Sequence, residues 1–313
     1  MSVKVFIDGS SGTTGLRIAD RLAERPEIEL LSISAEGRKD VHERAKVINS
    51  ADLAFLCLPD AASKEVMPLL RPDVKVLDTS TAFRTDAAWD YGFPELKGQK
   101  AKIQNSYRVA VPGCYASGFI SIARPLVELG LAPADYPFSC TGISGYSGGG
   151  KKMIAEYESA DRPAHSKLDA PKSYGLGLAH KHLPEMQKIS GLAHTPMFVP
   201  VVCDYYCGMQ VLVPLDLTLA GSTAEQVAEG IAAYYKDAAT VKVHALNEAL
   251  PENGLYSNAM AGTDRMELYM TVNAAGDQMM LVSVFDNLGK GSSGAAIQCM
   301  NLMLGLEETE GLE

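Results

Sequence analysis

The sequence predicts an α/β unit on a doubly wound parallel sheet, followed by an α+β unit on a mixed sheet. Over roughly the first 110 residues, short β-rich runs alternate with helical patterns, as in a parallel sheet with helices on both faces. From about Ser139 onward, longer β-rich segments follow one another with few helices between them, which is typical of a mixed or antiparallel sheet covered on one face. A chain of 313 residues is long enough for two such units.

The first unit is expected to begin with a strand and a helix. Apolar residues recur at helical spacing from Leu16 to Ala23, ahead of Pro26, and a second helix is expected at Ala61–Leu70. The run Leu53–Leu58 is apolar throughout, which predicts a strand buried on both faces of the sheet. The strands of this unit are expected at Val3–Ile7, Glu29–Ser34, Leu53–Leu58 and Val74–Asp78.

The second unit is expected to contain two helices, Gly118–Leu129 and Thr223–Tyr235. The last apolar segment, Ser293–Leu306, has helical spacing and is expected to fold back onto the first unit. We therefore expect a first domain of residues 1–113, completed by a C-terminal helix within 287–313, and a second domain of residues 114–286. The strands of the second unit are expected at Ser139–Tyr146, Met197–Val202, Gly208–Leu219, Leu268–Ala274 and Met279–Phe285.

Composition and charge exclude several classes of protein. A hydrophobic content of 47 % excludes a disordered chain, and no apolar run approaches the ~20 residues of a membrane-spanning helix. The formal net charge of −10 repels phosphate backbones, which excludes nucleic acid as a partner and requires local cations wherever an anion binds. No export signal is visible and the six cysteines are dispersed, so we expect a cytoplasmic protein with reduced thiols.

A glycine-rich turn follows the first strand and is followed in turn by an amphipathic helix. Its spacing, G-x-x-G-x-x-G, permits a tight turn, a close backbone approach and a helix N-terminus that faces a pyrophosphate. An ordinary strand–helix turn is the alternative, but the position between strand and helix favours a bound dinucleotide on a Rossmann-type unit. The candidate cofactor residues here are Gly9, Ser11, Gly12, Thr13, Thr14 and Gly15.

The end of the second strand indicates which dinucleotide binds. An NAD site usually has an acidic residue there, and Glu36 has suitable spacing for it. The small residue Ser34 at the strand end, with Arg38 and Lys39 just beyond it, favours the 2′-phosphate of NADP. The alternative is a solvated loop in which both cations are idle. We predict NADPH as the cofactor, with Ser34 and Arg38 among its ligands.

Cys114 stands in V-P-G-C-Y-A-S-G, directly before a helical pattern. A thiol near a helix N-terminus lies at the positive end of the helix dipole, which raises its thiolate fraction. A nucleophilic thiolate is what thioester-forming chemistry requires. A buried turn cysteine is the alternative.

The segment A-H-K-H-L-P-E-M contains two histidines, a proline and a glutamate. No metalloprotease motif has this pattern and no cysteine lies nearby, so we expect no metal site. Imidazole can accept a thiol proton and return one, which favours an acid/base role for His180 or His182. Pro184 and Glu185 predict the first turn of a helix.

Two further segments carry cations. Arg84 in D-T-S-T-A-F-R and Lys151 after a glycine run are candidates for holding an anionic substrate, although the glycine run equally suits a flexible surface loop. The stretch D-N-L-G-K-G-S-S-G precedes the final helix and contributes Asn287, Gly289 and Lys290 as candidate cofactor residues, with a hinge and N-cap as the alternative.

Five motifs in collinear order resemble the shorter form of the N-acetyl-gamma-glutamyl-phosphate reductase family, a relative of the semialdehyde and glyceraldehyde-3-phosphate dehydrogenases. P-G-C-Y and H-K-H-x-P-E are the specific ones, and the resemblance covers nearly the whole chain. Val111 departs from the asparagine that many members carry. The five motifs are G-S-S-G-T-T-G, D-T-S-T-A-F-R, V-P-G-C-Y-A-S-G, H-K-H-L-P-E-M and D-N-L-G-K-G-S-S-G-A-A-I-Q.

The resemblance implies NADPH-dependent reduction of N-acetylglutamyl 5-phosphate to its semialdehyde in arginine synthesis, through a thioester on Cys114. It implies acid/base work by His182 first and His180 second, with Glu185 orienting the imidazole or the substrate amide. It also implies a homodimer or homotetramer built on the second domain's sheet. The implied substrate-binding residues are Ser80, Arg84, Tyr115 and Lys151.

Two rival functions remain open from the sequence. One is the same chemistry on aspartyl phosphate or on a carrier-bound aminoadipyl phosphate. The other is a non-catalytic dinucleotide sensor, in which Cys114 is an unreactive thiol.

Overall fold

A computed structural model describes residues 2–313, and Met1 lies outside the described residues. The chain forms two compact units. The first comprises the chain up to Pro94, Gly98–Pro112 and Ser292–Leu312. The second comprises Glu95–Lys97, Gly113–Gly291 and Glu313.

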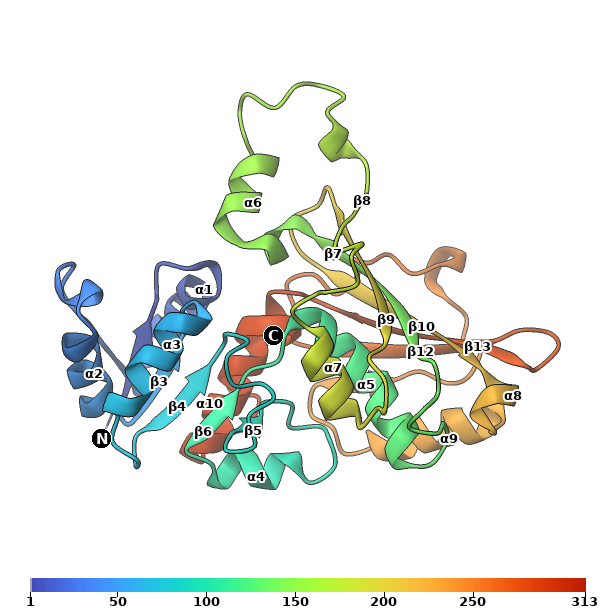
Figure 1. Ribbon diagram of the computed structural model, residues 1–313, viewed down its shortest axis with the longest axis horizontal. Coiled ribbons are helices and arrows are strands. Elements are labelled where there is room, and N and C mark those ends of the chain that lie inside the picture. The colour runs from blue at the N-terminus through green and yellow to red at the C-terminus, as the bar shows by residue number, and fades with distance from the viewer. Residues whose placement is uncertain (1) are drawn as a thin grey trace. The chain divides into compact units, whose positions relative to one another are not determined.

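The first unit is built on a parallel sheet, which counts six strands over the described residues, in the order β2-β1-β3-β4-β6-β5. Every registered pair is parallel (Figure 1). All four residues of β3 are buried. This confirms the parallel sheet that the alternating pattern predicts. The strands are β1 (Val3–Asp8), β2 (Ile28–Leu31), β3 (Leu53–Leu56), β4 (Lys75–Asp78), β5 (Asp90–Tyr91) and β6 (Arg108–Ala110).

Helices cover both faces of this sheet. Alternate residues of a strand point to opposite faces, and accordingly Phe55 and Leu56 belong to two different apolar clusters. One cluster takes side chains from α1, α4 and α10, and the other takes them from α2 and α3. The helices are α1 (Thr13–Ala23), α2 (Val41–Ser50), α3 (Asp60–Val66), α4 (Gln99–Asn105) and α10 (Gly294–Leu304).

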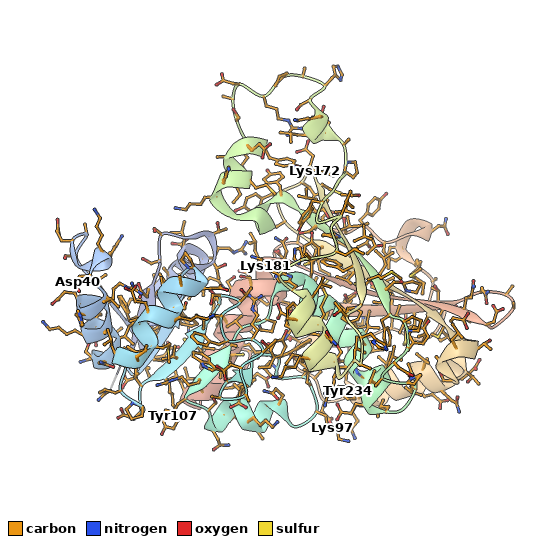
Figure 2. All side chains as sticks on the ribbon, in the orientation of Figure 1. Asp40, Lys97, Tyr107, Lys172, Lys181 and Tyr234 are labelled. Carbon is orange, nitrogen blue, oxygen red and sulfur yellow. The ribbon has the colours of Figure 1, made fainter. Side chains whose placement is uncertain are left out.

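Two local differences from the expected elements have simple causes. Helix α2 was not expected because few of its residues are apolar. Its start is fixed by Asp40, labelled in Figure 2. The Asp40 carboxylate accepts a hydrogen bond from the backbone N–H of His42 at 2.8 Å. The expected helix Ala61–Leu70 ends as α3 at Val66 and continues as a 3₁₀ turn, because Pro68 has no N–H to donate.

The second unit is built on a mixed sheet, which counts seven strands over the described residues, in the order β11-β12-β13-β10-β7-β9-β8. The pairs β11–β12 and β7–β9 are parallel and the others are antiparallel, as the sequence predicts for a mixed sheet. The strands are β7 (Ser139–Gly145), β8 (Lys172–Ser173), β9 (Met197–Cys203), β10 (Met209–Asp216), β11 (Val241–Val243), β12 (Met266–Val272) and β13 (Gln278–Phe285).

The strand expected at Gly208–Leu219 ends at Asp216. The Asp216 carboxylate accepts a hydrogen bond from the backbone N–H of Leu219 at 2.9 Å and thereby caps a short helix. The helices of the second unit are α5 (Cys114–Glu128), α6 (Gly150–Tyr157), α7 (Leu183–Ser190), α8 (Leu217–Ala220) and α9 (Ala224–Tyr234). Within residues 2–313, none of the helices combines the length and the apolar character needed to cross a membrane.

Helix α5 packs closely against β10 and β13 of this sheet. A Cβ added at Gly118 would lie 2.6 Å from Val211 Cγ2 and 2.7 Å from Ser283 Oγ. Only a residue without a side chain allows the helix to approach the sheet this closely, and this approach sets the depth at which α5 lies.

We expect Gly118→Ala to destabilise the protein by about 1–3 kcal/mol, because the added methyl overpacks the helix–sheet contact. Urea unfolding followed by circular dichroism measures the change. The comparison variant is Ala116→Gly on the same helix, which removes a methyl instead of adding one. Gly130→Ala is unsuitable for this purpose, because Gly130 has a φ of +68°, which alanine rarely adopts. Equal stability of Gly118→Ala and the wild type would contradict the close approach.

Candidate active site

The glycine turn between β1 and α1 has a backbone that other residues do not fit. Gly9 has a φ of +87°, and a Cβ there would lie 2.3 Å from the carbonyl oxygen of Cys57. A Cβ at Gly15 would lie 2.5 Å from the carbonyl oxygen of Gly9. Helix α1 begins at Thr13, directly after Gly12, so its N-terminus opens onto this turn. The turn has the geometry that holds a pyrophosphate at a helix N-terminus.

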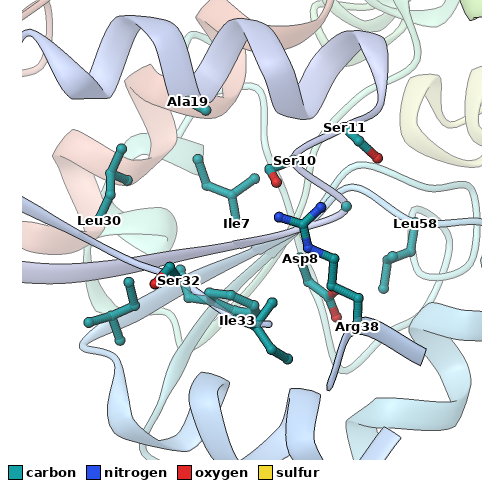
Figure 3. A pocket seen from close by; sticks show the side chains of 13 residues that line it. Ile7, Asp8, Ser10, Ser11, Ala19, Leu30, Ser32, Ile33, Arg38 and Leu58 are labelled. Atoms are coloured by element: carbon teal, nitrogen blue, oxygen red, sulfur yellow. The ribbon is translucent and has the colours of Figure 1, made fainter. Parts of the chain in front are cut away.

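A pocket of about 350 Å³ opens beside this turn, where β1 and β2 end (Figure 3). Arg38 is exposed and extends along its wall toward Ser10 and Asp8. Ser34 does not line the pocket: its hydroxyl accepts a hydrogen bond from the backbone N–H of Gly37 at 3.0 Å. The lining residue near the end of β2 is instead Ser32, which the sequence analysis did not select.

Beneath this pocket a buried ion pair neutralises the carboxylate at the end of β1. Arg44 Nε donates to Asp8 Oδ2 at 2.8 Å, and both side chains are nearly inaccessible. Burial raises the pKa of Asp8, and the neighbouring Arg44 acts in the opposite direction. Arg44 lies on α2, whose weak amphipathic pattern gave no signal of this partnership.

Cys114 is the first residue of α5, and Gly113 caps the helix. Because Cys114 is the first residue of the helix, its half-buried thiol lies at the positive end of the helix dipole, as the sequence predicts. The carboxylate of Glu185 accepts a hydrogen bond from the backbone N–H of Gly113 at 3.2 Å, and Glu185 is 2 % exposed. Glu185 therefore fixes the turn that carries Cys114, and its expected role of orienting the imidazole or the substrate amide stays a prediction.

Aromatic rings surround the histidine segment. The ring centroid of His180 lies 4.7 Å from that of His182, 5.1 Å from Phe198 and 5.9 Å from Tyr115. The ring of Tyr174 lies 5.9 Å from His180. The structure thus brings both predicted histidines against the residue that follows Cys114.

The two histidines differ in their surroundings. His182 is 5 % exposed and precedes α7, whereas His180 is half-buried. Burial, together with the positive charge of Lys181, lowers the pKa of His180 to about 4. Its Nδ1 accepts the backbone N–H of His182 at 3.2 Å, which assigns the proton of the neutral ring to Nε2. His180 is therefore a neutral imidazole with a donor at Nε2.

The side chain of Tyr115 forms part of the wall of this region. It is buried, its hydroxyl donates to the carbonyl of Val201 at 3.2 Å, and burial raises its pKa. A Cβ at Gly142 would lie 2.4 Å from the Tyr115 ring, so the ring can cross β7 only because position 142 has no side chain. In this structure the Tyr115 hydroxyl holds α5 to β9.

Two residues expected to contact substrate form hydrogen bonds within the first unit. Arg84 is buried, and its Nε and Nη2 donate to the carbonyls of Val111 and Thr79, each at 2.9 Å. Ser80 donates to Asp78 Oδ1 at 2.6 Å. They shape the loop that follows β4. Lys151, by contrast, is exposed at the start of α6.

The glycine-rich segment before α10 is also held from within. Asn287 is buried: its Oδ1 accepts from the N–H of Gly208 at 2.8 Å and its Nδ2 donates to Ser147 Oγ at 3.0 Å. A Cβ at Gly289 would lie 2.0 Å from the Thr263 carbonyl oxygen. The Lys290 side chain, a candidate cofactor residue, is 2 % exposed, and its ammonium donates to Glu95. Within the described part of the chain, no group of three His, Cys, Asp or Glu side chains is placed to hold a metal ion.

Each of the two units matches a known protein family. The NAD-binding domain of semialdehyde dehydrogenase matches residues 4–104, and the semialdehyde dehydrogenase dimerisation domain matches residues 114–287. The chain is similar over 96 % of its length to a solved aspartate semialdehyde dehydrogenase from Francisella tularensis, with a TM-score of 0.72 at 15 % identity. That comparison covers 100 % of the solved chain and bears on the fold.

Among curated proteins, the similarity is much greater to one kind of reductase. An N-acetyl-gamma-glutamyl-phosphate reductase from Trichormus variabilis is 46 % identical over 318 residues, covering 99 % of each chain. One from Burkholderia cenocepacia is 46 % identical over 305 residues, covering 96 % of this chain and 97 % of its own. With the glycine turn, the thiol at the start of α5 and the paired histidines in place, the chain belongs to the N-acetyl-gamma-glutamyl-phosphate reductase family.

Proposed function

We propose that this chain catalyses the NADPH-dependent reduction of N-acetyl-L-glutamyl 5-phosphate to N-acetyl-L-glutamate 5-semialdehyde and phosphate, in arginine biosynthesis. The family supports the substrate, and one observation carries the chemistry: Cys114 is the first residue of α5, with its turn fixed by the buried Glu185. A non-catalytic sensor has no need of a half-buried thiol at a helix N-terminus.

The residues of the first unit fit NADPH. The Gly9 and Gly15 positions form a cradle that any Cβ would fill, and the pocket beside them has the volume and the cation for an adenosine ribose phosphate. Ser32 and Arg38 stand where NAD enzymes place an acidic residue, which favours the 2′-phosphate. When bound, NADPH supplies a hydride to the acyl carbon. We propose that residues 1–113 and the helix within 287–313 form this cofactor domain, and that 114–286 carry out the chemistry.

Cys114 acts as the nucleophile. Its thiolate attacks the acyl carbon, the carbon–oxygen bond to phosphate breaks, and the phosphate leaves with the bonding electrons, so that a thioester remains on Sγ. After hydride addition, the tetrahedral thiohemiacetal collapses: the carbon–sulfur bond breaks, the aldehyde forms, and the thiolate is restored. The helix dipole of α5 stabilises the thiolate both before attack and after collapse.

The two histidines divide the proton work. His182 accepts the proton of the Cys114 thiol, and it remains our first choice for acid/base catalysis. His180 is neutral with its proton on Nε2, which suits it to donate a hydrogen bond to the oxygen that becomes negative when hydride adds. Tyr115 packs against both rings and restricts their orientation.

Lys151 is the residue we propose for the anionic groups of the substrate. It lies exposed at the beginning of α6, after Gly148, Gly149 and Gly150. Arg84 and Ser80 support the substrate indirectly, by fixing the loop that follows β4.

Arg38→Ala tests the assignment of the cofactor phosphate. We expect the KM for NADPH to rise by about 10- to 100-fold, because a charged hydrogen bond to phosphate is lost, and the KM for NADH to change little. Initial rates with each nucleotide measure the two constants. Lys39→Ala, at the neighbouring exposed cation that does not line the pocket, is the matched control. Equal changes for both nucleotides would show that Arg38 does not contact the 2′-phosphate.

A substrate comparison tests the function itself. Purified protein is assayed in the reverse direction, with NADP⁺, phosphate and N-acetylglutamate semialdehyde, and NADPH formation is followed by absorbance. We expect turnover that requires phosphate. Aspartate semialdehyde in the same assay is expected to give a far lower kcat/KM, and the opposite preference would overturn the proposed substrate.

The second unit is a semialdehyde dehydrogenase dimerisation domain, and we propose a homodimer or homotetramer formed through its sheet. The exposed side chains of Met197 and Val199 on β9 support this proposal. Light scattering on a sizing column measures the assembly, and a monomer at micromolar concentration would contradict it. We further propose that the enzyme works in the cytoplasm, where NADPH and reduced thiols are present.

A further inference from the structure

A π-helical turn, Gly289–Ser293, joins β13 to α10. π-helical turns are rare and frequently lie at functional sites. The start of this turn is anchored by Asp286, which is fully buried and accepts hydrogen bonds from the N–H groups of Leu288 at 2.8 Å and Gly262 at 2.7 Å. The N–H of Gly291 donates to the Asp286 carbonyl at 2.9 Å. The turn is therefore a fixed piece of backbone.

This turn lies directly against the proposed nucleophile. A Cβ added at Gly291 would lie 2.9 Å from Cys114 Cβ and 3.2 Å from a ring carbon of Phe285. Carbon atoms in contact lie about 3.5–4.0 Å apart, so the backbone of Gly291 occupies one side of Cys114 Cβ without a gap. The place of this turn limits the directions in which Sγ can point.

A buried ion pair holds the middle of the turn. Lys290 Nζ donates to Glu95 Oε1 at 2.7 Å, and the two side chains are 2 % and 1 % exposed. Thr240 Oγ1 donates to the same carboxylate oxygen at 2.5 Å. Taking both charges out of water is costly, and such pairs often contribute no net stability. Neither side chain takes part in the chemistry proposed above.

The carboxylate end of this pair is itself anchored. Glu95 belongs to Glu95–Lys97, a short segment that lies within the second unit. The N–H of Lys97 donates to the hydroxyl of Tyr234 on α9 at 3.0 Å, and the two residues lie side by side in Figure 2. The ion pair therefore connects a fixed point near α9 to the turn that touches Cys114.

We propose that the Lys290–Glu95 pair is a positioning element for Cys114: it fixes the π-helical turn so that Gly291 holds the thiol in its reactive rotamer. Lys290 and Glu95 are positioning residues and touch no reacting atom. The inference rests on the proposed function for its kinetic consequence, but its effect on the thiol is independent of any substrate.

The main test replaces the pair by apolar groups, in the double variant Glu95→Leu/Lys290→Met. This variant removes both charges together, so neither is left buried alone. We expect it to fold, with kcat lowered about 10- to 100-fold while KM stays near the wild-type value, because misplacement of a reacting group acts on the chemical step. We also expect slower alkylation of Cys114 by iodoacetamide, with the modified cysteine identified by mass spectrometry.

Two further variants keep the test decisive. Gly291→Ala places a methyl against Cys114 without touching the ion pair, and we expect the same fall in kcat and alkylation rate. Lys100→Met is the control, since it breaks the Lys100–Glu308 ion pair of the first unit, which shares no partner with Lys290 or Glu95, and it should leave both rates unchanged.

The outcomes separate two ideas. A folded double variant and a folded Gly291→Ala variant that both keep wild-type kcat and alkylation rates would overturn the positioning role. Suppose instead that alkylation is slower in both variants, but the wild-type protein does not reduce N-acetylglutamyl phosphate. This result would sustain the positioning role and overturn the proposed function.

Discussion

Cys114→Ser is expected to lower reductase activity by at least about 1,000-fold, because a serine hydroxyl at this position is not ionised and cannot form the thioester at a useful rate. The substitution is nearly isosteric, and Cys114 is half-buried at the start of α5, so the fold should tolerate it. The reverse assay with NADP⁺, phosphate and N-acetylglutamate semialdehyde measures the loss.

The control for this variant is cofactor binding. The glycine turn and the Arg38 pocket belong to the first unit and Cys114 to the second, so the Kd for NADPH, measured by fluorescence, should remain unchanged. Cys203→Ser is a matched comparison, because Cys203 is another half-buried cysteine outside any disulfide, and it should retain full activity. Appreciable phosphate-dependent turnover in Cys114→Ser would exclude this thiol as the nucleophile.

His182→Asn is expected to lower kcat by about 100- to 10,000-fold, the usual effect of removing a general acid or base. His180→Asn is expected to have the smaller effect, because a neutral hydrogen-bond donor is removed and the asparagine amide can partly replace it. The pH dependence of kcat distinguishes their roles: the ionisation attributed to the acid/base group should vanish in His182→Asn and persist in His180→Asn. The reverse pattern would exchange the two assignments.

The lowered pKa of His180 also predicts how acid affects stability. An unfolded histidine ionises near its ordinary pKa of 6.5, whereas burial keeps folded His180 neutral down to a pKa of about 4. Between these values the unfolded chain binds the extra proton, so stability is lost as the pH falls from 6.5 toward 4. Thermal unfolding at pH 7 and pH 5 should therefore show a smaller loss in His180→Asn than in the wild type.

The sequence predicted the architecture well because the responsible forces are local and repeated. The apolar run at β3 is buried as expected, and the thiol stands at a helix N-terminus as the P-G-C turn indicates. Helix α2 escaped prediction because its helical signal is a single capping aspartate and two buried apolar side chains, Ala45 and Ile48. Short strands such as β5 are defined by their neighbours in the sheet, and no local pattern announces them.

Within the site, residue types were predictable but their partners were not. Glu185 was selected for its place in the histidine motif, and only the fold reveals that its carboxylate also accepts the backbone N–H of Gly113, 72 positions earlier in the chain. Lys290 was selected as a candidate cofactor residue, and only the fold reveals that it forms a buried ion pair with Glu95. Charge alone does not distinguish a residue that meets a ligand from one that meets another part of the chain.

The first unit takes the apolar side chains on one face of its sheet from both ends of the chain. Ile297 and Met300 of α10 belong to the same cluster as Val5 and Ile18. During synthesis the N-terminal strands leave the ribosome first and α10 leaves last, so this face is covered only by α1 and α4 until nearly the whole polypeptide has been made. A message that ends prematurely after residue 291 would encode every catalytic side chain named above, yet it would yield a cofactor unit that lacks the helix closing its core.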